Sequence, residues 1–304
     1  MNTRSVRRAC ISLVAVGAAL SGLAACGGSD SGDKKSAPAK EQHKAGSDFS
    51  PVAALQAVQK KTDGVGSAKV ETTMSMGTVM GLEGTGTLAW GNGTTGAMRM
   101  KYTQGTMAQS MKQLGSDSID ARYLHDAYFA NMGPAFAKEL GGKHWIRYGY
   151  DDMARLMGPS GAVMKDQMQN STPQQGVKVL LASGDVKEVG TEEVRGVRTT
   201  HYSGTVDMAK LVVSSSGLDA KTLEAFKSQM TKSGISTDTV DIWVDKDDLL
   251  VKKTERAATK NGEMNTTAFY SDYGVKVSAE APAASDTVDF TSLIKPKSPA
   301  QQQS

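Results

Sequence analysis

Apolar and polar side chains alternate in several segments of this chain, and this pattern favours a fold built on a β-sheet. In SAKVETTMSM, Ala68, Val70, Thr72, Met74 and Met76 fall on one side of an extended backbone, and the residues between them fall on the other. A period of two is typical of a strand with one buried and one solvated face, as in antiparallel sheets. We therefore predict a half-buried antiparallel strand here.

Further strands follow from the same alternation. TVDIWVD places Val240, Ile242 and Val244 on one face. GNGTTG has the spacing of a dinucleotide-binding loop, but strand-like segments flank it on both sides and Asn-Gly is a strong hairpin signal, so we interpret it as a turn. Strands are also expected over residues 84–90, 95–102, 118–124, 144–148, 188–194, 197–206, 249–256 and 263–274.

Short helices with one apolar side interrupt the strands. Serine or threonine followed by proline is typical of a helix start, and glycine of a helix end. Each such helix needs a sheet face to cover. The pattern predicts an α+β fold: one large curved antiparallel β-sheet, a half-barrel, with short α-helices packed on its concave face. The helices are expected over residues 50–64, 172–184, 207–217 and 218–234.

The first 26 residues have the layout of an export signal. Three arginines precede an apolar run from Ala9 to Leu20, which is shorter than the roughly 20 residues that a bilayer-spanning helix needs. The tetrapeptide that ends at Cys26, Leu-Ala-Ala-Cys, resembles the bacterial lipobox, in which the cysteine receives a diacylglycerol and becomes the first residue. The alternative is a chance cysteine in an ordinary signal. We expect Cys10 to leave with the signal and Cys26 to anchor the protein to the extracytoplasmic face of the cell membrane.

Composition sets the domain organisation and limits the partners. We expect a signal peptide at 1–25, an acylated cysteine and flexible tether at 26–48, a single domain at 49–294 and a disordered tail at 295–304. The net charge of +3 comes from the signal, because removing residues 1–25 takes away three arginines and no acid and leaves 32 basic and 32 acidic residues. This balance predicts no nucleic-acid partner.

The residues that could carry chemistry form no catalytic or metal-binding pattern. No G-x-S-x-G is present, and the histidines, including His201, form no i, i+4 pair. The aspartates between 238 and 248 lack the glycine and the spacing of a calcium-binding loop. We expect His201 to hydrogen-bond to a neighbour in the sheet, with a zinc site assembled by the fold as the alternative. We therefore expect no enzyme activity, no cofactor and no metal.

Three segments carry a resemblance to a known group. GTEEVRGVRTTHYSGTVDM, VDIWVDKDDLLVKK and FYSDYG, in this order, resemble the actinobacterial lipoproteins of the LppX/LprG type, which belong to the LolA-like group. The likeness covers residues 67–290 and is strongest from Gly190 onward. It implies a half-barrel sheet plugged by helices, with a hydrophobic cavity between them. Members of this group carry acylated glycolipids or lipoproteins across an envelope.

Methionine is unusually frequent, with 16 residues against 6 phenylalanines. Its unbranched, polarizable side chain fits irregular or changing apolar partners, so it suits an acyl-binding cavity. The alternative is a core that uses methionine as filler. The residues expected to line a cavity are Met74, Met76, Met98, Met100, Val177, Leu180, Leu181, Leu211, Val212, Leu223, Phe226 and Met230.

Two functions follow from this interpretation. The first is a membrane-anchored lipoprotein that binds or carries a lipid, such as a glycolipid, by burying its acyl chains. The second is a sensor or protein-interaction module of the cell envelope with a filled core, whose functional surface would be the outer face of the sheet around Trp243. The sequence names neither the ligand nor a protein partner.

Overall fold

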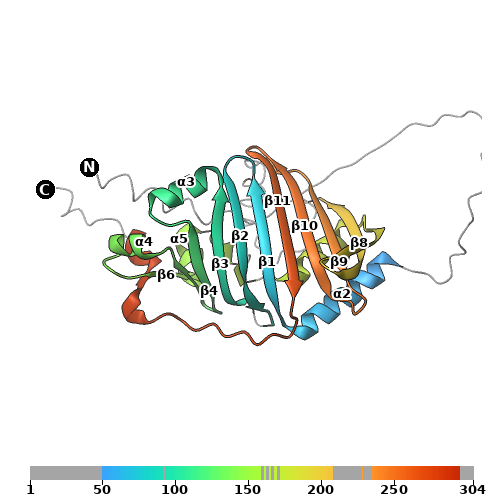
Figure 1. Cartoon of the computed structure of the whole chain (residues 1–304), viewed down its shortest axis with the longest axis horizontal. Coiled ribbons are helices and arrows are strands. Elements are labelled where there is room, and N and C mark those ends of the chain that lie inside the picture. The colour runs from blue at the N-terminus through green and yellow to red at the C-terminus, as the bar shows by residue number, and fades with distance from the viewer. Residues whose placement is uncertain are drawn as a thin grey trace, which may run out of the picture.

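A single 12-stranded sheet organises the part of the chain that the structure describes. This computed structural model describes residues 50–91, 93–158, 161, 164–165, 168–169, 172–207, 228 and 234–294. The strand order is β12-β6-β5-β4-β3-β2-β1-β11-β10-β9-β8-β7, and neighbouring strands are antiparallel except β12 and β6. The first and last long strands, β1 (Ser67–Met76) and β11 (Gly262–Ser271), therefore pair in the middle of the sheet (Figure 1).

The predicted strands are confirmed, with ends that shift by a few residues. β1 occupies the ten residues of SAKVETTMSM, and the paired strands on either side of the GNGTTG turn end at Ala89 and begin at Thr95, as the turn interpretation requires. The other predicted strands are β2 (Met80–Ala89), β3 (Thr95–Gln104), β4 (Ser118–Tyr123), β6 (Trp145–Gly149), β7 (Lys187–Val194), β8 (Val197–Val206), β9 (Asp238–Val244) and β10 (Leu250–Thr259).

Two strands escaped the sequence patterns. β5 (Ala127–Asn131) has four consecutive buried residues, so it shows no alternation of apolar and polar side chains. β12 (Thr287–Asp289) is only three residues long and pairs in parallel with β6 at the edge of the sheet. Both strands depend on neighbours that are distant in the chain, which local periodicity does not reveal.

The helices start as their capping residues predict. In α2 (Pro51–Val65), the hydroxyl of Ser50 accepts a hydrogen bond from the backbone N–H of Ala53. This helix ends one residue later than expected, because Gly66 takes the left-handed conformation, φ +75°, and donates its N–H to the carbonyl of Thr62. α7 (Pro173–Ser183) also matches its prediction. The two helices expected between 207 and 234 lie outside the described residues, apart from Ser228, which is helical.

Among the helices whose bounds lie within the described residues, α3 (Gly105–Gln113), α4 (Pro134–Glu139), α5 (Tyr150–Met157) and α10 (Phe290–Ile294) were not predicted. The N-cap residues of the first three are Gln104, Gly133 and Gly149, so none has the serine or threonine that would mark its start in the sequence. Packing against the sheet stabilises them instead. Met111 of α3 and Met153 of α5 are buried in one cluster with residues of β4, β5 and β6.

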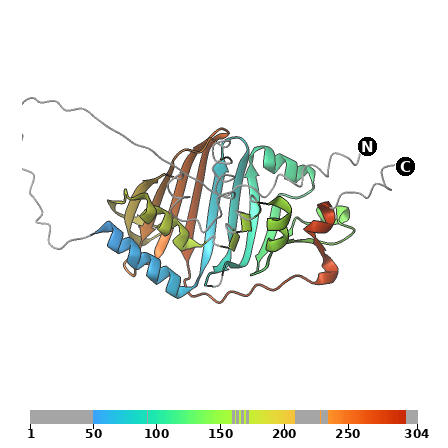
Figure 2. The ribbon, with the colours of Figure 1, turned by 180° about the vertical axis from the view of Figure 1, so that it is seen from behind.

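The helices cover one face of the sheet, as predicted. Figure 2 shows α2 in blue and α7 in yellow-green lying across that face. We call it the helix-covered face; it carries Val70, Thr72, Met74 and Met76 of β1, and the opposite side is the open face. Leu55 of α2, Leu180 of α7 and Ile242 of β9 belong to one fully buried cluster. The observed architecture is therefore the predicted α+β class, with a large antiparallel sheet and its core under the helices.

The C-terminal crossing segment, residues 272–286, ties the middle of the sheet to its far edge. Figure 1 shows this segment in red, passing below the ends of the strands from β11 towards β12. The hydroxyl of Ser67 donates to the carbonyl of Val275 at 2.8 Å, and Arg122 donates to the carbonyl of Glu280 at 2.8 Å. These hydrogen bonds hold an otherwise extended segment against the sheet.

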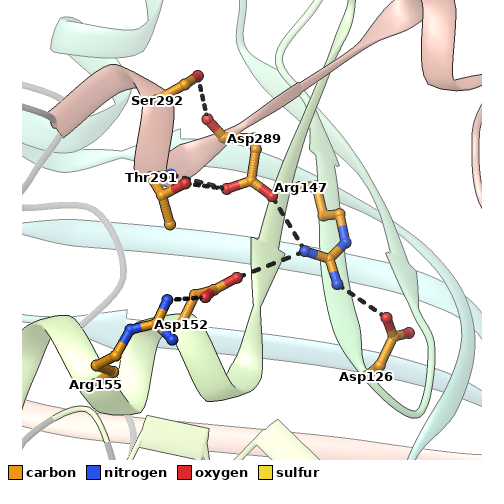
Figure 3. Close-up of polar contacts among 7 residues, drawn as sticks. All are labelled: Asp126, Arg147, Asp152, Arg155, Asp289, Thr291 and Ser292. Atoms are coloured by element: carbon orange, nitrogen blue, oxygen red, sulfur yellow. Dashed lines mark hydrogen bonds and ion pairs between the residues drawn. The ribbon is translucent and has the colours of Figure 1, made fainter.

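Arg147 joins the end of the crossing segment to the rest of the fold (Figure 3). Its guanidinium donates to Asp126 at 2.9 Å and to Asp289 at 3.1 Å, and lies 3.8 Å from Asp152 of α5. Asp289 in turn accepts from the backbone N–H of Thr291 at the start of α10. Burial acts to raise the pKa of Asp289, but hydrogen bonds from Thr291 and Arg147 outweigh it and hold the pKa below its ordinary value. The Arg147 side chain thus links β6 to the residue before β5, to α5 and to β12 at this edge of the sheet.

Candidate functional site

The helix-covered face carries a run of methionines across the centre of the sheet. In the β1 register, Met76 lies between Met80 of β2 and Met264 of β11, and Met74 lies between Leu82 and Thr266. Met76, Met80 and Met264 are buried, whereas Met74 is half-buried. The predicted same-face pair of β1 is therefore confirmed, and it continues into both neighbouring strands.

Glycines in β2 make room for the methionines of β3. Met98 pairs with Gly86, and Met100 pairs with Gly84. A Cβ placed on Gly84 would lie 3.3 Å from Cε of Met98, so the methionine side chain extends over the glycine. A Cβ on Gly86 would lie 2.1 Å from the carbonyl oxygen of Ala97, so this position has space only for hydrogen. The result is a flexible apolar surface on closely packed strands.

The predicted lining residues that the structure describes lie on this face or on α7, which covers it, in different packing environments. Val177 and Leu180 of α7 are completely buried in the cluster that includes Met98, and Leu181 packs against its edge. Met76 belongs to a separate small cluster with Ala257 and Met264. Their role in binding a ligand stays a prediction. Cys26 and the predicted lining residues Leu211, Val212, Leu223, Phe226 and Met230 lie outside the described residues.

Sequence reasoning missed a polar group on the same face. Lys253 and Glu255 of β10 form an ion pair at 2.8 Å, with side chains 14% and 22% exposed. Lys253 lies against α7, because a Cβ on Gly176 would be 2.3 Å from its Cδ. Asp238 of β9, opposite Ala257, is 5% exposed, and its Oδ1 has no hydrogen-bond partner. The signal was present: Asp238 continues the alternation of Val240, Ile242 and Val244.

Burial and charge determine the ionisation of this group. Burial, followed by the negative charge of Glu255, raises the pKa of Asp238 to about 7. Burial acts to lower the pKa of Lys253, but the Glu255 carboxylate outweighs it and holds the pKa above its ordinary value. At neutral pH, Lys253 and Glu255 therefore compensate each other, and Asp238 is divided between its neutral and charged forms.

The open face carries a second cluster, around Trp243. The ring of His201 stacks on the indole with centroids 4.3 Å apart, and the Nζ of Lys252 lies 3.8 Å from the indole centroid. The indole N–H donates to Glu192. His201 Nε2 lies 2.9 Å from Asp241 Oδ1, which confirms that His201 is hydrogen-bonded within the sheet. Trp243 is only 6% exposed, so it lies beneath its neighbours rather than at the surface.

Within the described ranges, no group of three or more His, Cys, Asp or Glu residues is suited to hold a metal ion. In the same ranges, no helix combines the length and the apolar composition that crossing a bilayer would require.

Comparisons with known proteins place the chain among Streptomyces proteins. It is 61% identical over 247 residues to an uncharacterized 31.2 kDa protein from the rplA-rplJ intergenic region of Streptomyces griseus, covering 81% of each chain. It is 44% identical over 307 residues to a Streptomyces coelicolor protein named "Putative lipoprotein", covering 97% of this chain and 98% of the relative. No family model matches.

Among solved structures, the chain is similar to the lipoprotein LppX of Mycobacterium tuberculosis. The sequence identity is 14%, the match covers 76% of this chain and 98% of LppX, and the TM-score is 0.45.

Proposed function

Because the chain belongs to the family of Streptomyces lipoproteins that includes its S. coelicolor relative, we propose that it binds a lipid on the helix-covered face of its sheet. In this proposal residues 1–25 are removed, Cys26 carries the lipid anchor, and residues 26–48 tether the domain at the extracytoplasmic face of the cell membrane. The protein acts by burial of acyl chains and not by chemical conversion.

The observation that carries the proposal is the methionine run across β3, β2, β1 and β11. Met74 and Met100 are half-buried, although both belong to the interior face of the sheet. Acyl chains vary in length and curvature, and methionine side chains adapt to such partners without branching or polar atoms. Each methylene that leaves water contributes about 0.8 kcal/mol, so a single acyl chain offers ample driving force.

The first test is mass spectrometry of lipids extracted from the full chain. The protein is isolated from native membranes in a mild detergent, beside a delipidated sample and a mock purification. We expect a non-covalent lipid in stoichiometric amount. A protein that comes out empty, and that also takes up no fluorescent acyl probe after delipidation, would refute the proposal and turn attention to crosslinking for a protein partner.

A pair of neighbouring substitutions locates the binding face. Met74→Glu places a charge on the helix-covered face, whereas Thr73→Glu places the same charge on the exposed, open face one residue away. We expect the first variant to lower uptake of the acyl probe at least tenfold and the second to leave it unchanged, with thermal unfolding of both recorded as a control. Equal effects of the two variants would move the ligand off this face.

A further inference from the structure

One cross-strand row of the helix-covered face links a buried carboxyl to three methionines. The register of the strands brings its members side by side, from β8 at one end to β2 at the other: Val206, Asp238, Ala257, Met264, Met76 and Met80. With strands about 4.8 Å apart, Asp238 lies roughly 14 Å from Met76, three strands away. The row therefore has one polar side chain, Asp238 beside Val206 near its β8 end, which we call the polar end, and is apolar along the rest of its length.

The polar end has one unsatisfied group. Asp238 is 95% removed from solvent, yet its Oδ1 accepts no hydrogen bond. A buried acceptor without a donor loses its hydrogen bond to water and gains none in the protein, which is why such groups in native proteins call for an explanation. The adjacent cation does not supply the missing contact, because Lys253 is paired with Glu255 at 2.8 Å.

We propose that Asp238 Oδ1 accepts a hydrogen bond from a hydroxyl of an uncharged lipid headgroup, whose acyl chain then follows the row over Ala257, Met264 and Met76. This inference rests on the proposed function and adds to it the class of ligand and its direction on the face. The headgroup lies over β9 and β10, and the acyl chain points towards β1 and β2.

Charge selects a neutral headgroup over a phosphate. Along the strand residues of β8, β9, β10 and β11 on this face, the charged side chains near the row are Asp238, Lys253 and Glu255, and Arg198 lies eight residues from Val206 at the other end of β8. Lys253 and Glu255 compensate each other, so the remaining charge is that of a carboxylate or zero. An anionic phosphate would meet net repulsion in a poorly solvated place, whereas a hydroxyl supplies the donor that Asp238 Oδ1 lacks.

The test compares two lipids that share one acyl chain. Delipidated full-length protein is mixed with 1-oleoyl glycerol or with 1-oleoyl lysophosphatidate, and the complexes are counted by native mass spectrometry. We expect the glycerol lipid to bind at least tenfold more tightly. Asp238→Leu should abolish this preference, Asp238→Asn should keep binding of the glycerol lipid because its amide oxygen still accepts, and Asp247→Leu in the exposed β9–β10 turn should change nothing.

The outcomes separate the inference from the function on which it rests. Equal binding of the two lipids by the native protein, or a preference that survives Asp238→Leu, would overturn the headgroup assignment while leaving acyl binding in place. Failure of both lipids to bind would refute the proposed function itself. Thermal unfolding of each variant shows that a lost preference does not come from lost folding.

Discussion

Asp238→Asn should make the stability of the delipidated protein less dependent on pH. Asp238 is 5% exposed, and burial raises its pKa from 3.8 to about 7. Below pH 3.8 the carboxyl is protonated in both the folded and the unfolded state and has no effect. Between pH 4 and 7 the unfolded chain ionises first, so the free energy of unfolding falls as the pH rises. Above pH 7 the full penalty is present.

The size of this penalty follows from the pKa. At about 1.4 kcal/mol for each pH unit, an elevation from 3.8 to about 7 corresponds to about 4 kcal/mol. Asparagine keeps the shape of the side chain and has no ionisation. The difference in free energy of unfolding between the variant and the native protein should therefore grow by several kcal/mol from pH 4 to pH 8, in favour of the variant.

Urea unfolding followed by tryptophan fluorescence and circular dichroism at pH 4, 5, 6, 7 and 8 measures this difference. Asp247→Asn is the matched control, because its carboxyl is exposed in the β9–β10 turn. Its difference from the native protein should stay nearly flat with pH. A flat profile for Asp238→Asn as well would show that the carboxyl ionises as it does in water, and the reasoning from burial would be wrong.

Three further predictions concern the anchor, the sheet edge and the sheet interior. Cys26→Ala should abolish incorporation of labelled palmitate, whereas Cys10→Ala should keep it; label retained by the first variant would disprove the lipobox assignment. Arg147→Met should release the C-terminal crossing segment, seen as faster limited proteolysis there, at a cost of about 1 kcal/mol in global stability because the ion pairs are partly exposed. Gly86→Ala should destabilise the fold by about 2 kcal/mol in urea unfolding, because the added Cβ would collide with the backbone of the next strand. Gly91→Ala is the control and should leave stability unchanged, because no atom lies within 4 Å of its added Cβ. Equal losses of stability in the two variants would contradict this packing argument.

Local patterns predicted the strands that have one face in water. SAKVETTMSM alternates because one side is covered by helices and the other is exposed, so its bounds follow directly. AYFAN does not alternate, because in β5 both sides are buried against other parts of the chain. Serine or threonine before proline revealed α2 and α7, whereas α3, α4 and α5 follow Gln104, Gly133 and Gly149 and depend on contacts that only the folded sheet offers.

The candidate site likewise combines features that the sequence predicts with features that only the fold creates. Alternation alone assigns Met74 and Met76 to the interior face, and it assigns Asp238 to the face of Val240 and Ile242. It does not say that Asp238 and Met76 share one row, because that row runs through the pairing of β1 with β11, at opposite ends of the domain. Strand register decides which side chains become neighbours, and the resulting burial decides the ionisation of a carboxyl. Faces and helix starts are thus local properties of the sequence, whereas the row and its polar end exist only in the folded protein, where distant strands meet.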